Sequence, residues 1–254
     1  MAALLVEEQR TDLSIPFFEL PGWEQRFGVV AGITARGSLT DPFDLGLVSE
    51  QPTRRVLERW RALRAALPDF HSAIIARQVH GTTVLWHGPT RGWVVLEGAD
   101  GHATSEHGVL LTVSVADCIP IYLVDPAVRA VGLLHAGWRG TAAGIVREGI
   151  QTLTRSAKSS VENLVMHCGV GVCGRCYEVG SEVAVACGGP VSISDGKHYL
   201  DLRQRIEDQA AREGIRSITV SPYCSAHDSD RFFSHRASGG ADGRMVACLG
   251  LRHP

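Results

Sequence analysis

The chain has 254 residues, of which 44% are hydrophobic and 20% are charged, a composition typical of a globular protein that builds its own core. Its 25 Lys and Arg and 27 Asp and Glu give a formal net charge of -2, so we expect no polycationic surface for nucleic acid or membrane lipid. Seven cysteines are too few for a disulfide scaffold, and the sequence shows neither a long apolar run nor a signal peptide, so we expect a reduced, cytoplasmic protein.

Short apolar runs separated by turn residues dominate the first half of the chain. They predict strands at residues 28–34, 73–79, 84–86, 93–97, 109–115, 119–124 and 130–134. Between the first two runs, apolar residues recur at helical spacing and a group of arginines occupies the remaining positions. We interpret this stretch, residues 54–67, as an amphipathic helix whose arginines face solvent.

The second half of the chain combines helices with further strands. A helix is predicted to begin near Thr141, a suitable N-cap, because apolar residues recur at helical spacing from there to Leu153. The elements predicted after it are strand 163–168, helix 201–213 and strand 215–220. Strands and helices interleave without strict alternation, so the sequence predicts one α+β domain with mixed sheets over residues 1–254, with residues 1–27 as an N-terminal extension.

Several familiar catalytic signatures are missing, since there is no Walker loop, no H-E-x-x-H helix and no G-x-S-x-G elbow. Instead, short polar segments follow three of the predicted strands, at residues 78–81, 116–118 and 135–141. They contribute His80, Cys118 and His135, and two imidazoles with one thiolate are a donor set that zinc prefers. Because these residues are far apart in sequence, two hydrogen-bonded histidines and a buried cysteine fit the same pattern.

The third polar segment also carries an arginine. Arg139 lies within His135-Ala136-Gly137-Trp138-Arg139-Gly140-Thr141, where small residues allow the backbone to approach a ligand closely. We predict that Arg139 lies just before a helix N-terminus, a place suited to holding phosphate. The alternative is a simple strand-to-helix turn with a surface charge.

Six blocks of the sequence stand out, and they occur in a fixed order. They are Arg77-Gln78-Val79-His80-Gly81, Ala99-Asp100-Gly101 with Thr104, Asp117-Cys118 with Pro120, His135 to Thr141, Cys176-Tyr177-Glu178-Val179-Gly180 and Phe232-Phe233-Ser234-His235-Arg236. In this order they resemble the YfiH-like or laccase-domain family, long labelled multicopper polyphenol oxidases and now understood as zinc-dependent purine nucleoside enzymes. The resemblance spans residues 28–251, and the block that starts at His135 is its most specific part.

The resemblance implies a fold and an activity. The fold is a four-layer α/β/β/α sandwich with mixed β-sheets, and the catalytic zinc ion is bound by His80, Cys118 and His135. The activity is phosphorolysis of adenosine, inosine and 5′-methylthioadenosine to the base and ribose 1-phosphate, with deamination of adenosine. Purine nucleosides and phosphate are therefore the expected partners, rather than nucleic acid or a membrane, and the oligomeric state stays open.

Six residues near these blocks are candidates for binding substrate or phosphate, namely Arg36, Gln78, Asp117, Arg139, Ser234 and Arg236. Arg36 and Arg139 are expected to form a cationic cradle for phosphate. Gln78 and Asp117 adjoin zinc ligands and could position either the ligands or the substrate. The chain departs from the family at residues 34–38, where Thr-Ala-Arg-Gly-Ser replaces Thr-Arg-His-Gly-Gly. This departure predicts an altered substrate preference or reduced activity.

Two other functions fit the same residues. Without a metal, Cys118 could be the nucleophile of a hydrolase that cleaves amide bonds in cell-wall precursors, with His135 as its base. With a closed coordination shell, the zinc could belong to a non-catalytic binding protein. A multicopper oxidase is rejected because the sequence has no His-x-His pair, although copper could occupy the zinc site adventitiously.

The remaining cysteines and histidines receive a structural interpretation. Two of the remaining cysteines, Cys173 and Cys176, form a C-x-x-C pair, which is typical of a redox pair or of half of a zinc ribbon. They belong to a group of four that is completed by Cys168 and Cys187. Because Cys176 falls within a family block, we interpret these thiols as packing residues. His102 and His107 are placed in a loop, and the other histidines are expected at the surface or in hydrogen bonds.

Overall fold

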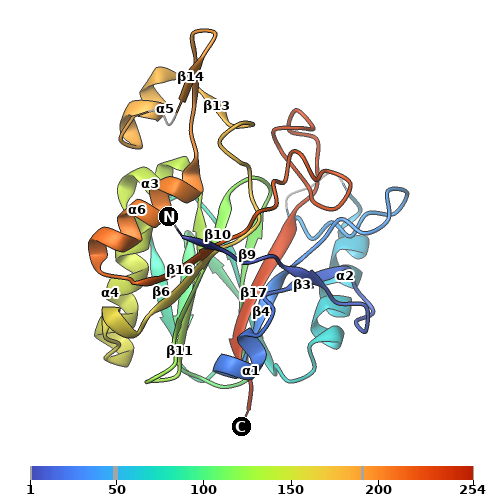
Figure 1. Cartoon of the computed structure of the whole chain (residues 1–254). Coiled ribbons are helices and arrows are strands. Elements are labelled where there is room, and N and C mark those ends of the chain that lie inside the picture. Colours follow the sequence, from blue (N-terminus) through green and yellow to red (C-terminus); the bar gives the residue numbers. More distant parts are fainter. Residues whose placement is uncertain (1, 48–50, 190–191, 254) are drawn as a thin grey trace.

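The computed structural model describes residues 2–47, 51–189 and 192–253, and these form two large facing β-sheets with helices on the outer sides (Figure 1). In the described residues the first sheet has seven strands, in the order β1 (Ala3–Leu4), β16 (Ser217–Val220), β12 (Val165–Cys168), β10 (Ile119–Asp125), β11 (Ala130–Ala136), β8 (Gly101–Thr104) and β6 (Val84–His87). The second also has seven in those residues, in the order β2 (Glu8–Gln9), β3 (Phe17–Glu19), β4 (Val29–Thr34), β17 (Met245–Leu251), β9 (Val109–Val115), β5 (Ser72–Arg77) and β7 (Gly92–Glu97).

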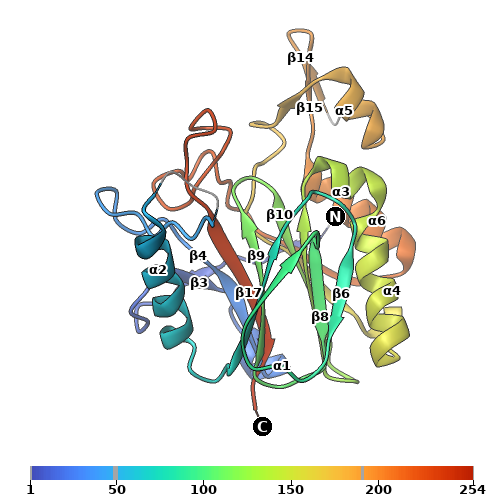
Figure 2. The same cartoon turned by 180° about the vertical axis from the view of Figure 1, so that it is seen from behind.

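Helices cover the outer face of each sheet and complete four layers. The first sheet is covered by α3 (Trp138–Ala143), α4 (Ile145–Ala157) and α6 (Leu202–Glu213), and the second by α2 (Thr53–Ala66), as the two opposite views show (Figures 1 and 2). Both sheets contain parallel and antiparallel pairs, for example β5 parallel to β9 and β17 antiparallel to β9. The predicted α+β class and the α/β/β/α order of layers are therefore confirmed.

Three apolar clusters hold these layers together. The cluster between the sheets combines Tyr122 and Leu133 of the first sheet with Ile33 and Leu249 of the second. Two outer clusters join α4 and α6 to the first sheet and α2 to the second. Strands β10 and β11 are buried along their whole length, because they have the interior on one side and helices on the other. This is why their sequences are nearly continuous apolar runs instead of alternating ones.

The helix predicted near Thr141 differs from the observed one. The chain becomes helical earlier, at Trp138, and α3 ends after Ala143 because Gly144 adopts φ 91°. Gly144 then serves as the N-cap of α4, and Thr141 lies inside α3 as a buried residue instead of capping a helix. Since the left-handed region strongly favours glycine, the break follows from residue 144 itself.

Several elements were not predicted. They are the strands β1, β2, β3, β8 and β17, the helix α1 (Trp23–Phe27), the 3-10 turn η1 (Val161–Asn163), and a small unit of α5 (Ser181–Ala186) with β13 (Glu178–Val179), β14 (Ser192–Ser194) and β15 (Lys197–Tyr199). The first three of the missed strands matter most, because β1 pairs with β16 in one sheet while β2 and β3 extend the other beside β4. Residues 2–27 therefore contribute strands to both sheets.

Two further observations concern function classes. Residues 169–174 read Gly-Val-Gly-Val-Cys-Gly directly after β12, which matches the spacing of a dinucleotide-binding loop. The two-residue strand β13 follows this segment, where a dinucleotide site needs a helix, so the match carries no cofactor site. In the described ranges, no helix has both the length and the apolar character needed to cross a membrane.

Two histidines form a buried pair between β6 and β8. His102 was predicted in a loop, but it lies in strand β8 and its side chain has 0% exposure. Its Nδ1 is 3.0 Å from Nε2 of His87 at the end of β6. Burial, reinforced by the neighbouring His87, lowers the pKa of His102 to about 3. Burial also lowers the pKa of His87. Both rings are therefore neutral in the folded protein at neutral pH.

This pair predicts a loss of stability in mild acid. The unfolded chain takes up protons on these rings below their ordinary pKa of about 6.5, and the folded chain does not. Stability is thus complete above that pH and falls as the pH drops toward 3, by about 1 kcal/mol per pH unit for each proton. Urea unfolding between pH 7 and 4 should show a shallower decline for His102→Gln than for the wild type. His235→Gln, at an exposed histidine, should retain the full decline, and equal slopes in all three proteins would contradict the assignment.

Candidate metal centre and active site

Three chain crossings between the two sheets meet at one end of the sandwich. β5 leads into β6, β7 into β8, and β9 into β10, so each crossing leaves the second sheet and enters the first. Because β5 is parallel to both β7 and β9, all three crossings leave the same edge of that sheet. The crossings carry His80, Asp100 and Cys118. His135 joins them because β11 runs antiparallel to β10, which places the end of β11 beside the start of β10.

The structure brings together the three predicted metal ligands. Ligand atoms of His80, Cys118 and His135 all lie within 4.8 Å of one another. The two imidazole rings are 4.9 Å apart between centroids and nearly perpendicular, at 76°. His135 is buried and Cys118 half-buried, whereas His80 is exposed, so the cluster is closed on the protein side and accessible on the other.

Asp100 organises the cluster, and the sequence analysis did not assign it a role. Its carboxylate has 0% exposure and accepts four hydrogen bonds. Oδ1 accepts from His135 Nδ1 and from the backbone N–H of His80, both at 2.9 Å. Oδ2 accepts from the backbone N–H of Gly81 at 2.8 Å and of Val79 at 3.1 Å. Asp100 therefore orients both histidines. Its position in the Ala99-Asp100-Gly101 block was the signal that could have identified it.

Two residues of the site adopt backbone angles that glycine normally occupies. His80 has φ 59° and Asp117 has φ 84°. Non-glycine residues in this region cost on the order of 1 kcal/mol or more each, and they persist where surrounding contacts fix them. At His80 these contacts are hydrogen bonds to Asp100, because the turn directs three successive backbone N–H groups at its carboxylate.

Gly137 allows His80 and Cys118 to lie close together. It follows His135 and Ala136 on β11, and the pairing of Ile119 with Ala136 brings it beside Cys118. A Cβ atom at Gly137 would lie 2.9 Å from His80 Cδ2 and 3.0 Å from Cys118 Sγ. Contacts this short between such atoms are not tolerated, so only glycine lets the two ligands approach from this side.

The charges of the cluster stabilise one another. Burial alone would raise the pKa of the Cys118 thiol, but the charge of His135 and hydrogen bonds from His135 and His80 lower that pKa to about 6. Burial alone would lower the pKa of His135, yet Cys118 and Asp100 raise it to about 9. Asp100, despite its burial, keeps a pKa below its ordinary value because of its hydrogen bonds from His135, Gly81 and Val79. Cys118 is therefore a thiolate at neutral pH, which is the form that binds metals.

A second network surrounds Asp117, next to the metal ligand Cys118. Its Oδ1 accepts hydrogen bonds from Ser225 Oγ at 2.6 Å and Ser234 Oγ at 2.7 Å, and its Oδ2 accepts from the backbone N–H of Arg236 at 2.6 Å. Ser234 is fully buried. These contacts tie the loop between β16 and β17, drawn in orange-red in Figure 1, to the metal cluster. Among the predicted substrate contacts, Asp117 and Ser234 thus hold this loop in place.

Arg36 belongs to the same network. Its guanidinium is 2.5 Å from Asp242 Oδ2, and that oxygen also accepts from the backbone N–H of Ser234. The guanidinium carbon lies 4.5 Å from the ring centre of Phe233. Its Nε atom is buried and has no hydrogen-bond partner among the described residues. Arg36 therefore keeps one donor free beside the loop that carries Ser234.

The other three predicted contacts are arranged differently. Gln78 Nε2 donates a hydrogen bond to Ser114 O at 2.8 Å, and Gln78 Oε1 accepts one from the Ser114 N–H at 2.7 Å. This side chain therefore joins the end of β5 to β9. Arg139 is exposed on α3 and stacks on its neighbour Trp138, 4.3 Å from the ring centre. The Arg236 side chain is also exposed; it donates to Glu178 O at 2.8 Å and lies over Tyr177.

Tyr177 is a further residue at the site that was not assigned a role. Burial and the negative charge of Cys118 raise the pKa of its phenol to about 12. Its hydroxyl is therefore protonated at neutral pH and can donate a hydrogen bond.

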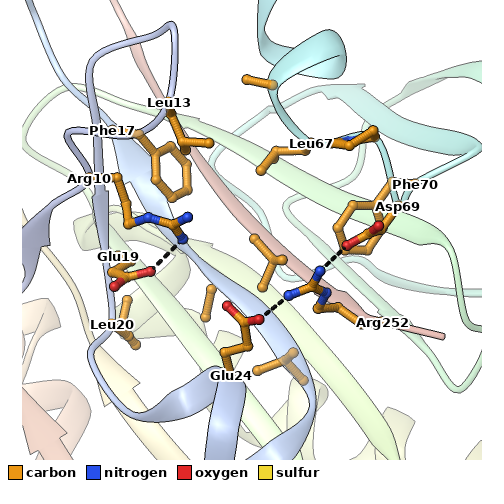
Figure 3. Close-up of a pocket in the computed structure, with 15 residues that line it drawn as sticks. Arg10, Leu13, Phe17, Glu19, Leu20, Glu24, Leu67, Asp69, Phe70 and Arg252 are labelled. Atoms are coloured by element: carbon orange, nitrogen blue, oxygen red, sulfur yellow. Dashed lines mark hydrogen bonds and ion pairs between the residues drawn. The ribbon is translucent and has the colours of Figure 1, made fainter. Parts of the chain in front are cut away.

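One pocket of the described structure lies away from the metal cluster. A pocket of about 310 Å³ lies between β3, α1, β4 and the end of α2, and its lining includes none of the predicted site residues (Figure 3). Its charged side chains pair with each other, Arg10 with Glu19 at 2.8 Å and Arg252 with Asp69 at 2.6 Å and with Glu24. These ion pairs satisfy the charges of the pocket internally.

The donor set of the cluster fits a borderline-soft divalent metal. Two imidazoles and a thiolate are already close enough to share one ion, and Asp100 holds the Nδ1 proton of His135 so that its Nε2 is free to coordinate. Three protein donors leave a coordination position on the exposed side of His80. This arrangement is that of a catalytic metal site, whereas a structural site is enclosed by four ligands.

Comparison with known proteins extends these observations. The family described as "Multi-copper polyphenol oxidoreductase laccase" matches residues 29–252. "Purine nucleoside phosphorylase YlmD" of Geobacillus stearothermophilus is 33% identical over 252 residues, covering 89% of this chain and 91% of the relative. A "Purine nucleoside phosphorylase" of Deinococcus radiodurans is 36% identical over 231 residues, with 88% and 85% covered. "Adenosine deaminase RL5", from an unknown prokaryotic organism, is 33% identical over 160 residues, with 59% and 61% covered.

The fold agrees with the sequence comparison. The crystal structure of YlmD from Geobacillus stearothermophilus superposes with a TM-score of 0.89 at 28% identity, covering 98% of this chain and 100% of that one. The resemblance seen in the six sequence blocks is thereby confirmed over nearly the whole chain. The chain belongs to the YfiH-like, laccase-domain family.

Proposed function

We propose that this protein is a zinc-dependent purine nucleoside phosphorylase that also deaminates adenosine. The observation that carries the proposal is the three-donor cluster of His80, Cys118 and His135, open on the side of His80. The names of the relatives, purine nucleoside phosphorylase and adenosine deaminase, supply the substrate class. The free thiols and the thiolate ligand suit a reducing compartment, so we place the protein in the cytoplasm.

Different residues of the chain have different roles in these reactions. When bound, zinc in such a site supplies a Lewis acid and lowers the pKa of water at its open position. His135 is held in one tautomer by Asp100, and Cys118 is held as a thiolate by the two histidines. In phosphorolysis the glycosidic C–N bond breaks and a bond from phosphate to the ribose carbon forms, so the chain must hold an anion beside the sugar. We assign this role to the exposed guanidinium groups of Arg139 and Arg236, together with Arg36, whose buried Nε has no hydrogen-bond partner among the described residues.

A second candidate function has one observation in its favour. Asp100, His135 and Cys118 are linked in series, with the carboxylate on Nδ1 and the thiolate on the other side of the ring. This order matches the nucleophile, base and orienting group of a cysteine hydrolase. His80 adds a ligand that such a hydrolase does not need, and a metal-bound thiolate is no free nucleophile. We therefore prefer the zinc enzyme.

Product analysis tests the proposal. The purified protein is incubated with adenosine, with and without phosphate, and the products are identified by mass spectrometry. We expect adenine and ribose 1-phosphate only when phosphate is present, and inosine in both samples. A chelator should abolish all three products, and added zinc should restore them. Zinc-loaded protein that forms no product would overturn the proposal. Amide hydrolysis that persists after chelation would favour the cysteine hydrolase.

The proposed phosphate contacts give a separate prediction. Arg236→Gln and Arg139→Gln should each raise the KM for phosphate about tenfold, since one charge-assisted hydrogen bond contributes about 1.5 kcal/mol or more. The KM for adenosine in the deamination assay should change little. Arg147→Gln is the matched control, because this exposed arginine on α4 pairs with Glu213. An unchanged KM for phosphate in both variants would remove these arginines from the site.

A further inference from the structure

A second cluster of metal-ligating side chains lies outside the active site. It consists of Cys173, Cys176, Cys224 and His227, whose ligand atoms all lie within 4.8 Å of one another. The sequence analysis grouped Cys173 and Cys176 with Cys168 and Cys187 as packing thiols. The structure instead joins them to a cysteine and a histidine about fifty residues further along the chain. We propose that these four residues bind a structural zinc ion.

The first two ligands come from a tight turn. The backbone N–H groups of Cys176 and Tyr177 both donate to Cys173 O, at 3.0 and 3.1 Å. The Cys173 thiol accepts hydrogen bonds from the backbone N–H groups of Arg175 and Cys176. A turn that directs amide N–H groups at a cysteine sulfur stabilises the thiolate, the form in which cysteine binds a metal.

The other two ligands come from a second turn. Asp228 N–H donates to Cys224 O at 2.8 Å, and the Asp228 carboxylate accepts from the Cys224 N–H at 2.9 Å, which closes one helical turn over residues 224–228. Cys224 and His227 therefore face the same side, three residues apart. The sequence of ligands is C-x-x-C followed later by C-x-x-H, and each half is a preformed turn.

The two turns are fixed against each other independently of any metal. Gly171 and Cys224 form a parallel bridge, with Ser225 N–H donating to Gly171 O at 3.0 Å. The Cys173 N–H points at Cys224 Sγ, 3.3 Å away. The four donors thus converge because the backbone brings both turns together.

The distances agree with tetrahedral zinc. Bonds of about 2.3 Å to sulfur and about 2.0 Å to nitrogen place a sulfur and a nitrogen about 3.6 Å apart in a tetrahedral site. His227 Nδ1 is 3.6 Å from Cys173 Sγ and 3.6 Å from Cys176 Sγ. His227 Nδ1 is therefore equidistant from both sulfurs, at about the separation that a shared ion requires. Cys176 Sγ is also 3.3 Å from Nε2 of the same ring, so a rotation of this exposed side chain has to direct one nitrogen at the ion. A simple redox pair of Cys173 and Cys176 needs neither Cys224 nor His227.

The donor set also indicates the metal and its role. Three thiolates and one imidazole are soft to borderline ligands that favour zinc over calcium or magnesium. Four protein donors fill a tetrahedral shell, so no position remains for substrate. The site therefore differs in kind from the three-donor cluster at His80, and we assign it a structural role.

The consequence of this second ion concerns the catalytic cluster. The first turn leads directly into Tyr177, whose ring lies under the guanidinium of Arg236, and the backbone N–H of Arg236 bonds Asp117 beside Cys118. The second turn contains Ser225, which hydrogen-bonds Asp117 next to that ligand. Zinc at the second site would therefore join the two segments that border the active site, without touching the substrate.

Zinc content per chain tests the proposal, and it does not depend on activity. The protein is purified under reducing conditions without chelator, and metals are counted by inductively coupled plasma mass spectrometry. We expect about two zinc ions per wild-type chain and about one in each of His80→Ala, Cys176→Ser and His227→Ala. His80→Ala combined with His227→Ala should retain almost none. Cys187→Ser and His235→Ala, at residues outside both clusters, should keep about two. Wild-type protein with one zinc ion that is lost in His80→Ala would overturn the proposal.

A spectroscopic measurement covers the case in which a cysteine variant does not fold. His80→Ala changes an exposed residue of the other site, and this variant is prepared with cobalt supplied in place of zinc. We expect the strong near-ultraviolet absorption of cobalt bound to several thiolates to remain. Its absence, or a disulfide between Cys173 and Cys176 found by mass spectrometry of the reduced preparation, would contradict a structural zinc site.

Discussion

Replacing Asp100 by alanine is expected to weaken metal binding at the His80 cluster by about 10- to 100-fold and to lower catalytic activity in parallel. The carboxylate fixes the tautomer of His135 and receives three amide N–H groups from residues 79–81. Without it, these buried donors lose their acceptor, and the strained turn at His80 loses the contacts that hold it. We also expect the free energy of unfolding to fall by about 3 kcal/mol or more, because a charged partner is removed from a buried pair.

The matched control for this change is Asp125→Ala. Asp125 is also fully buried, and its carboxylate accepts from Ala127 and Val128 in the turn between β10 and β11. This turn lies at the opposite end of both strands from Cys118 and His135. Asp125→Ala should therefore reduce stability but leave zinc affinity unchanged. Competition with a chromophoric chelator measures the affinity, and wild-type affinity in Asp100→Ala would contradict the role given to this residue.

Replacing Gly137 by alanine is expected to lower kcat/KM by about 100-fold, while the protein remains folded. The added methyl group would lie within 3.0 Å of both His80 and Cys118, so at least one ligand must move by several tenths of an ångström. A misplacement of about 1 Å at a catalytic group can cost about two orders of magnitude in rate, and here the contact affects two ligands of the same cluster. Gly88→Ala, in the turn between β6 and β7, is the control, because a Cβ atom there meets nothing within 4 Å.

The measurement for Gly137→Ala should separate binding of the metal from its use. Zinc content is determined first, and the activity of the zinc-loaded variant follows. We expect reduced affinity and, at saturating zinc, a persistent loss of activity. Full activity at saturating zinc would show that the ligands tolerate the methyl group, and the close contact at Gly137 would then have no functional importance.

The strands of the central layers could be predicted from the sequence because strands buried on both faces consist almost entirely of apolar residues. The apolar runs at 109–115, 119–124 and 130–134 match β9, β10 and β11 to within two residues. Other strands lack this signal. β8 contains His102 and Thr104, both buried, and His102 Nδ1 and Thr104 Oγ1 form hydrogen bonds to β6. A strand stabilised in this way looks like a loop in the sequence.

The candidate metal ligands were predicted from their chemistry and from the family resemblance, while the residues that support them depend on the topology. Nothing local in the sequence relates Asp100 to His135, since their contact needs β11 to lie beside β8. The same applies to the second cluster. Cys176 and His227 meet only because the two segments bridge at Gly171 and Cys224. Sequence spacing shows the two halves of such a site, and the fold decides whether they converge.

The order in which the strands pair has a consequence for the synthesis of the protein. β4, made early, pairs with β17, which is the last strand of the chain, and β1 pairs with β16. During synthesis on the ribosome, β1 and β4 therefore lack these partner strands until almost the whole chain has emerged. Pairings between such distant segments also fold slowly, and unpaired edges favour aggregation. The interval between translation of the first and last strands is thus the period in which this protein most needs a chaperone.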